Sequence, residues 1–474
     1  MTESTVSLII TVRAGEASET IEKAISIMDI ESDLDQAFLI GQQEVTAMLL
    51  DLLEAQLHAY ISRHTDWKNL GTDRRSVLLE SGSITYRRHI YQDKEGKRRK
   101  PFDDLLHLQP YQRNSKKVEA MAASLAASSS FRDAAELFSY VLKEPVSAST
   151  IHRMTARVGG KLQAIEAVED ARNLEPGKIV APVIMAEADG TFIKLQREKA
   201  KQAEVKVGIF YTGKQAIAPH RNRLINKVIS CQLGMTNEEW QQHLCALAYR
   251  HYDMSKVQFL QIGGDGAKWV RKSFDHLGIA EQHLLDRFHV IRSLNTAFGS
   301  ALMGSDIQAK LFSQGFSAIE ADLLRIIADQ KGEKKELQKR SFDYLKINQD
   351  ALIDLDKRGL GDRDFCTMGA MEGNVDKLVA QRMKGKGRSW RIEGARCMLA
   401  VLRYKSLIKT EAFAMTPMPK PEPKSRWKYQ RYKAPEWTPK TTSMPMFSCT
   451  HGSDNWIQLL KSKVNDMLSI NGFF

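Results

Sequence analysis

Apolar residues recur at helical spacing in two parts of the N-terminal half of the chain. Residues 33–64 follow the three- and four-residue steps that bury one face of a helix. Residues 116–160 show the same periodicity, with a break at Pro145. We expect two helices around this break, FRDAAELFSYVL capped by Ser130 and ASTIHRMTARVG capped by Ser147, the second ending at a glycine pair. The pattern predicts no helix or strand for residues 1–30.

Strand patterns occupy two further regions. Turn signals at Ser81-Gly82 and Glu95-Gly96 surround an alternating run, which predicts a basic β-ribbon over 76–110. From residue 179 the apolar runs are IVAPVIMAEAD, TFIKLQ, EVKVGIFYTG and RLINKVISCQLG, and VQFLQIGGD and HLLD follow after a helix. Short turns between the early runs predict an antiparallel start, and helical crossovers predict parallel strands later. This order is the α/β ribonuclease-H-like arrangement, a mixed sheet with helices on both faces.

Charge and cysteine content narrow the class of protein. The net charge of +12 favours a polyanionic partner, although a merely soluble basic protein is the alternative. Five cysteines without a C-x-x-C pair indicate free thiols in a reducing compartment. We expect neither a signal peptide nor a membrane span, and a cytoplasmic, nucleoid-associated location.

Three acidic residues predict a metal site. Asp189 and Asp265 each end an apolar run, and Glu372 opens the helical pattern MEGNVDKLVAQRM. Two such strand tips and a helix-borne glutamate can hold two Mg²⁺ (or Mn²⁺) ions about 3.5–4 Å apart, the spacing used in phosphoryl displacement. Each of these residues also has a simpler explanation when it is taken alone. An aspartate before a glycine is typical of a turn, and a glutamate at the start of a helix interacts favourably with the helix dipole. Rival carboxylates are Glu187, Asp286 and Glu393.

Basic and aromatic positions are candidates for contact with DNA. The two helices around Pro145 have a helix-turn-helix layout, in which the second helix can enter the major groove; a packing hairpin is the alternative. The loop after the glutamate combines glycines, cations and Trp390, which either stacks on an unpaired base or is buried. The candidates are Arg87, Arg88, Ser149, Thr150, His152, Arg153, Lys268, Lys384, Lys386, Arg388, Trp390 and Arg391.

Several blocks in a fixed order resemble a known family. The runs EADGTFIKLQ, EVKVGIFYTG, GGDGAKW, LLDRFHVIRSL and EGNVDKLVAQRMKGKGRSW resemble the ISLre-type insertion-sequence transposases of bacteria, which are DDE transposases. The resemblance spans roughly residues 80–405. It implies Asp189, Asp265 and Glu372 as the metal-binding acids. It adds Asp286 and His289, whose D-x-x-H spacing is similar to the C/D-x-x-H signature of Mutator-like and hAT-like transposases.

The resemblance also implies a partner and an assembly. We expect double-stranded DNA, as transposon ends and target, to be cleaved and joined by a homodimer or a larger synaptic oligomer, and the sequence itself predicts no role for a membrane. The expected regions are an N-terminal helical region (1–75), the basic β-ribbon (76–110), a helix-turn-helix DNA-binding domain (111–170), the first part of the catalytic core (179–290), an all-helical insertion (291–368), the second part of the core (369–410), and a basic Pro-rich arm with a C-terminal helix (411–474).

Two other functions remain open at this point. A catalytically inactive or domesticated DNA-binding protein needs only the basic surfaces, and a structure-specific nuclease needs the same acids. The run GGDGAK lacks the G-x-x-x-x-G-K-[ST] spacing of a phosphate loop, so ATP-driven chemistry is not expected.

Overall fold

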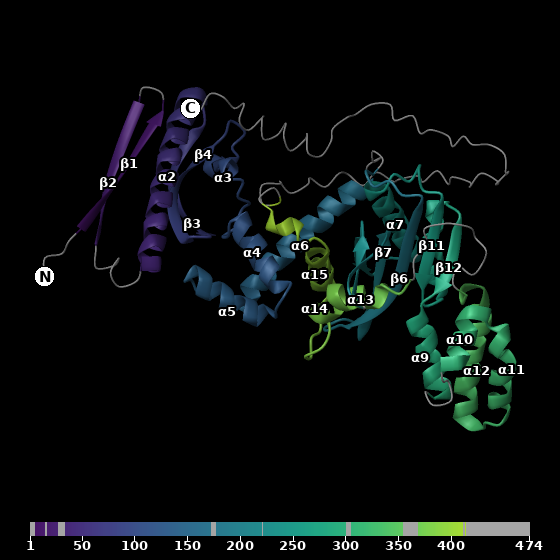
Figure 1. Cartoon of the computed structure of the whole chain (residues 1–474). Coiled ribbons are helices and arrows are strands. Elements are labelled where there is room, and N and C mark those ends of the chain that lie inside the picture. Colours follow the sequence, from purple (N-terminus) through teal and green to yellow (C-terminus); the bar gives the residue numbers. More distant parts are fainter. Residues whose placement is uncertain are drawn as a thin grey trace.

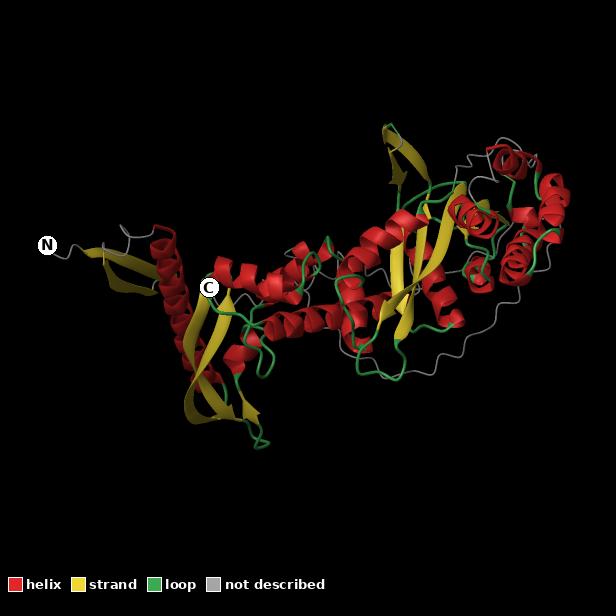
Figure 2. Ribbon diagram, turned by 90° about the horizontal axis from the view of Figure 1, so that it is seen from below, coloured by secondary structure: helices red, strands yellow, loops and turns green. Residues whose placement is uncertain are grey.

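The computed structural model describes residues 5–14, 17–26, 34–171, 177–219, 221–299, 305–353, 368–410 and Phe413. N-terminal strands, a helical middle region, a central sheet and a helical bundle follow one another along the molecule (Figures 1 and 2). The predicted basic arm and C-terminal helix lie outside the described residues. In the part of the chain that is described, no helix is long and apolar enough to cross a membrane.

The N-terminal region combines one long helix with antiparallel strands. Strands β1 (Thr5–Ala14) and β2 (Ala17–Ser26) form a hairpin where the sequence pattern predicted no element. Helix α2 (Leu34–His64) confirms the predicted helix. The predicted ribbon is also confirmed, and its two long strands are β3 (Lys68–Leu79) and β4 (Gly82–Gln92). The short strand β5 (Arg98–Arg99) pairs with β4, and helix α3 (Pro101–Leu105) follows it.

Three helices connect this region to the sheet. They are α4 (Lys116–Ala126), α5 (Phe131–Leu142) and α6 (Ala148–Ala171). Ser130 caps α5 as predicted, in a reciprocal arrangement with the side chain of Asp133.

The predicted end of the second helix is wrong, because α6 continues through its glycine pair to Ala171. A Cβ atom at Gly159 would lie 2.3 Å from the carbonyl oxygen of Cys397 in helix α15 (Ile392–Arg403). The glycine therefore allows two helices to pack closely and does not terminate one of them. A buried ion pair between Glu166 and Arg403, at 2.5 Å, joins the same helices.

The central element is a five-stranded mixed sheet in the order β10-β7-β6-β11-β12. The strands are β6 (Val183–Lys194), β7 (Gln202–Tyr211), β10 (Val228–Leu233), β11 (Phe259–Gly264) and β12 (Glu281–Leu285). Strands β6, β7 and β10 pair antiparallel, whereas β11 runs parallel to both β6 and β12. The mixed sheet with antiparallel early strands and parallel later strands is thus confirmed.

One predicted turn in this sheet is wrong. Strand β6 continues through Asp189 and Gly190, where the sequence pattern predicted two strands joined by a turn. A Cβ atom at Gly190 would lie 2.2 Å from Oε1 of Glu204, so this glycine admits a neighbouring side chain. Asp189 consequently lies inside a strand and not at its tip.

Helices cover both faces of the sheet. Odd-numbered apolar residues of β6 and β7 pack in one core with α6, α15 and helix α13 (Met371–Val375). Even-numbered residues pack against α7 (Asn237–His251) and α8 (Lys268–Lys272). Because side chains alternate along a strand, Asp189 belongs to the face that α13 covers.

A helical bundle lies at one end of the sheet (Figure 1). It consists of α9 (Arg287–Phe298), α10 (Ser305–Gln314), α11 (Ser317–Ala328) and α12 (Gly332–Ile347), which share a hydrophobic core. The helical pattern predicted after the sheet is therefore confirmed for 305–353. Residues 354–367 lie outside the described part.

A buried carboxylate fixes the start of α13 on β6. Glu187, which is 1% exposed, accepts the hydroxyl of Tyr211 at 2.6 Å. It also accepts the backbone N–H groups of Gly369, Ala370 and Met371 at 3.2, 3.0 and 3.2 Å. Burial raises the pKa of Glu187, and the hydrogen bonds from Tyr211 and Ala370 oppose that shift. These bonds satisfy the N–H groups that a helix start leaves without partners.

We predict that Glu187→Gln loosens the start of α13, because an amide NH₂ group would face backbone N–H groups that now find an acceptor. The free energy of unfolding should fall by about 2 kcal/mol. Amide hydrogen exchange at residues 369–375 should accelerate. Urea unfolding and hydrogen-exchange mass spectrometry measure the two effects.

The matched control is Glu393→Gln. Glu393 is exposed and its ion pair with Arg396, at 2.8 Å, lies on the surface. Its loss should change the stability by less than about 0.5 kcal/mol. Exchange at 369–375 that is equally slow in Glu187→Gln and in the unaltered protein would contradict the anchoring role.

Candidate active site

Strand register places three aspartates in one row across the sheet. The parallel ladders pair Gly263 with Glu187, and Gly264 with Leu285. Continuing these ladders sets Asp265 between Asp189 and Asp286. Neighbouring strands are about 4.8 Å apart, so the three acids occupy adjacent positions at this part of the sheet.

The charges of these aspartates act on one another. Burial raises the pKa of Asp189 to about 6, and the nearby charges of Asp265 and Asp286 add to the effect. The N–H of Gly190, which donates to Asp189 Oδ1 at 2.7 Å, and the charge of His289 act in the opposite direction. The arrangement concentrates negative charge that a bound cation would neutralise.

The predicted D-x-x-H residues lie at the junction of β12 and α9. Asp286 is 5% exposed and caps α9, because its Oδ1 accepts the N–H of Phe288 at 2.9 Å. His289 lies in the first turn of α9, close enough for its charge to influence Asp189. The structure therefore brings four predicted residues together: Asp189, Asp265, Asp286 and His289.

Within the described part of the chain, the Glu372 side chain forms no hydrogen bond or ion pair with these four residues. It is exposed in the first turn of α13, and the helix itself packs against β6 and β7. Among the described residues, no three His, Cys, Asp or Glu side chains are arranged to hold a metal ion. The convergence of the three predicted acids on metal ions stays a prediction.

Tyr344 of α12 is a site residue that the sequence analysis missed. Its hydroxyl donates to the backbone carbonyl of Asp265 at 2.9 Å. Burial raises the pKa of Tyr344, and the charges of Asp265 and Asp286 raise it further. A tyrosine in an amphipathic helix carries no local signal for this role, because the contact arises only when the bundle docks on the sheet.

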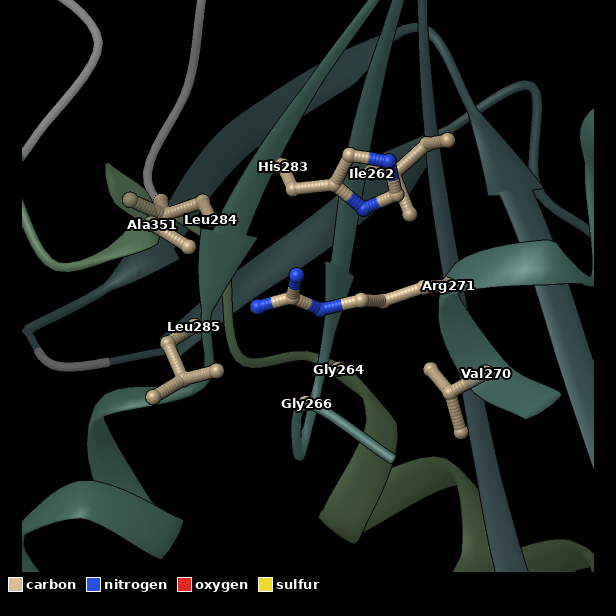
Figure 3. Close-up of a pocket in the computed structure, with 9 residues that line it drawn as sticks. All are labelled: Ile262, Gly264, Gly266, Val270, Arg271, His283, Leu284, Leu285 and Ala351. Atoms are coloured by element: carbon tan, nitrogen blue, oxygen red, sulfur yellow. The ribbon is translucent and has the colours of Figure 1, made fainter. Parts of the chain in front are cut away.

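A second contact joins the bundle to the turn that holds Asp265. Arg271 of α8 donates to Oδ1 of Asn348, the residue that follows α12. A Cβ atom at Gly266 would lie 2.7 Å from the same oxygen. Figure 3 shows the Arg271 side chain reaching across a small pocket beside Gly264, Gly266 and His283. The turn after β11 is therefore held from outside the sheet.

The predicted DNA contacts of the β-ribbon divide into one exposed and one buried arginine. Arg87 is exposed. Arg88 is 8% exposed and pairs with Asp73 at 2.6 Å and with Asp103. The prediction that Arg88 contacts DNA is therefore wrong, because two carboxylates already hold its guanidinium inside the ribbon.

The candidates at the start of α6 are largely accessible. Ser149, His152 and Arg153 are exposed, and Thr150 is half-buried. Arg153 donates to Oγ1 of Thr150 at 3.2 Å, and the His152 ring contacts the ring of Phe131 edge to face. Contact of these residues with DNA stays a prediction.

The loop after α13 contains a buried aromatic residue. Trp390 is 6% exposed, its Nε1 donates to the carbonyl of Met383 at 2.9 Å, and Arg382 lies over its ring. The prediction that Trp390 stacks on an unpaired base is wrong, because its ring is packed in the protein. Arg388 donates to the carbonyl of Gln381 at 2.9 Å and so caps the end of the preceding helix.

The remaining cations differ in exposure. Lys384 is half-buried and donates to Oγ1 of Thr191, two residues beyond Asp189 on the same face of β6. Lys268, Lys386 and Arg391 are exposed. Their contact with DNA stays a prediction.

Comparison with solved structures gives only weak likenesses. The chain matches the Drosophila P element transposase strand transfer complex at 12% identity, covering 63% of this chain and 81% of that one, with a TM-score of 0.23. It matches a pre-cleavage Mos1 transpososome at 11% identity, covering 47% and 75%, with a TM-score of 0.13. These scores are too low to support an argument about fold or function.

Sequence relatives are more informative. A UPF0236 protein of Caldanaerobacter subterraneus subsp. tengcongensis is 22% identical over 364 residues, which cover 76% of this chain and 73% of the relative. A second UPF0236 protein of that organism is 21% identical over 364 residues, covering 76% and 74%. The family model described as uncharacterised protein family UPF0236 matches residues 20–409. Because that match spans most of the chain, the protein belongs to the UPF0236 family.

Proposed function

We propose that this protein is a metal-dependent DNA transposase, with the five-stranded sheet as its ribonuclease-H-like catalytic domain. The observation that carries the proposal is the parallel register of β6, β11 and β12, whose continuation by one or two residues brings Asp189 of β6 beside Asp265 and Asp286, the residues that follow β11 and β12. The strand order, three antiparallel strands followed by two parallel ones, agrees with that domain. The resemblance of several sequence blocks to DDE transposases supports the same assignment.

The donor groups suit a hard divalent cation. Carboxylate oxygens are the ligands that Mg²⁺ prefers, and Mg²⁺ retains several waters, so a few carboxylates suffice. Asp189 stands among like charges in a partly buried position, and a cation beside it would relieve their repulsion. When bound, two Mg²⁺ or Mn²⁺ ions would activate the attacking oxygen and stabilise the leaving oxygen of a phosphodiester.

In this proposal the protein residues have separate roles. Asp189 and Asp265 bind the shared ion, and Glu372 completes the second site from α13. Asp286 is the alternative third ligand, because it lies beside Asp265 in the register. His289 positions the scissile phosphate from the first turn of α9.

The rest of the chain would hold DNA and organise the reaction. We assign contact with the DNA backbone to the exposed candidates, namely Arg87, Ser149, His152, Arg153, Lys268, Lys386 and Arg391. Helices α5 and α6 serve as the helix-turn-helix, and the bundle containing α10–α12 is the insertion of the catalytic domain. A homodimer or larger assembly brings two transposon ends together.

Two alternatives predict different reaction products. A DNA-binding protein without catalysis binds DNA but joins no strands, and a structure-specific nuclease hydrolyses DNA without joining it. The test uses the full chain, labelled DNA from both flanks of its own gene with pre-nicked ends, and a supercoiled plasmid as target. Mg²⁺-dependent joining supports the proposal, whereas hydrolysis alone or binding alone contradicts it.

We predict that Asp189→Asn lowers the rate of strand joining by about 10²–10³-fold or more, because a neutral amide is a poor substitute for a metal-binding carboxylate. DNA affinity should change little, since Asp189 does not contribute to attraction of the DNA backbone. Gel analysis of joined products and fluorescence anisotropy measure the two quantities. Asp329→Asn, an exposed position at the end of α11, is the control and should join DNA normally.

The third ligand is tested by comparing Glu372→Gln with Asp286→Asn. We expect Glu372→Gln to abolish joining and to remove one of two Mn²⁺ ions counted by calorimetric titration. Asp286→Asn should lower stability by about 1 kcal/mol through loss of the α9 cap, and joining should fall by less than about tenfold. The reverse pattern would reassign the third ligand to Asp286.

Tyr344→Phe tests the contact between the bundle and the Asp265 turn. Loss of the hydroxyl leaves the Asp265 carbonyl without this donor, so we expect about 1 kcal/mol lower stability and several-fold weaker Mn²⁺ binding. Calorimetry in the absence of DNA measures the binding. Tyr249→Phe on the surface of α7 is the control, and equal Mn²⁺ affinity in all three proteins would refute the positioning role.

A further inference from the structure

A two-stranded hairpin extends from the sheet and was not among the predicted DNA contacts. Strands β8 (Gly213–Ala218) and β9 (Arg221–Ile225) pair only with each other and connect β7 to β10. Figure 2 shows this hairpin standing clear of the five-stranded sheet. Its described residues are mostly exposed, including Ile217 at 52%. Leu224 of β9 packs against the core on the α13 side of the sheet, whereas most of the ribbon faces solvent.

The segment that contains this hairpin has basic side chains but no acidic ones. Residues 205–237 contain five Lys or Arg residues and no Asp or Glu. Arg221 and Arg223 are exposed on β9, and neither side chain forms an ion pair or hydrogen bond with the described residues. A solvated surface hairpin usually mixes both signs of charge, so a stretch without acids favours a polyanionic partner.

The base of the hairpin contacts α13, the helix that carries Glu372, and the residue Met368 that precedes it. Lys214 donates to the carbonyl of Met368 at 3.5 Å, and Lys227 donates to Oδ1 of Asn374 in α13 at 3.1 Å. Burial lowers the pKa of Lys227, and the neighbouring charge of Lys377 lowers it further. Like charges are thus held together beside the helix that carries Glu372, and a phosphate group between them would relieve their repulsion.

We propose that the β8–β9 hairpin binds the phosphate backbone of duplex DNA and guides it along the face covered by α13. The inference rests on the proposed function, since both require DNA as the partner. A second copy of this chain is the less suitable occupant, because each copy carries a net charge of +12. Contact with phosphates carries no sequence information. The hairpin therefore increases the affinity for DNA and sets the path of the duplex along the protein, and other elements read the base sequence.

The test compares full-length variants by fluorescence anisotropy on a labelled duplex of about 30 base pairs, at salt concentrations from about 50 to 200 mM. For Arg221→Ala/Arg223→Ala we expect about tenfold weaker binding. The slope of log affinity against log salt should decrease by about two, because two phosphate contacts are lost. Arg221→Lys/Arg223→Lys should retain the slope of the unaltered protein.

The charge-matched control is Lys256→Ala/Lys272→Ala. Both lysines are exposed on the α7–α8 side of the sheet, so their loss removes the same net charge away from the proposed path. We expect less than about a twofold change in affinity. Circular dichroism and thermal unfolding verify that each variant remains folded.

The experiment distinguishes failure of the hairpin proposal from failure of the proposed function. If the unaltered protein binds DNA and the alanine pair at Arg221 and Arg223 has the same affinity and slope, the hairpin proposal is overturned while the proposed function stands. If the unaltered protein binds no DNA, both are overturned. If the pair changes self-association in sedimentation but leaves the salt slope unchanged, the hairpin binds a second copy and the DNA proposal is wrong.

Discussion

The parallel register of β6, β11 and β12 is the constraint on which the candidate site depends. Positions 189, 265 and 286 are separated in the chain, and the continuation of these ladders brings them together. Like charges in a partly buried row disfavour the fold unless a cation or protonation compensates them. In the proposed function, the metal ions would supply this compensation.

Much of the local structure follows from patterns that the sequence displays. Ser130 and Pro145 mark helix boundaries because capping and a missing N–H act within a few residues. Asp265 and Asp286 follow apolar runs that become β11 and β12. The turn predicted at Asp189-Gly190 is wrong, because a glycine occurs both in turns and where a neighbouring side chain approaches the backbone closely. Only the position of Glu204 decides between these cases.

Side-chain roles could be predicted less well, because they depend on partners from distant segments. Arg88 has the pattern of a DNA-contacting arginine until Asp73 and Asp103 are placed beside it. Trp390 likewise sits among glycines and cations in the sequence, yet its ring is packed under Arg382. Tyr344 gives no signal at all, since its importance comes from docking a helical bundle on the Asp265 turn. Sequence patterns identify residue types at a surface, but burial decides which of them are free to bind.

The anchoring of α13 also limits how Glu372 can reach the aspartates. Glu187 holds three successive backbone N–H groups at the start of the helix, so rotation of the helix there would break several buried hydrogen bonds at once. Further along, the π-helical turn at Asp376–Ala380 alters the helix after Glu372 and leaves that start in place. The exposed Glu372 side chain, by contrast, changes rotamer at little cost and on a fast timescale. In the proposed function, approach of this carboxylate is therefore a matter of its own torsions on a fixed helix, and a bound cation would supply the attraction.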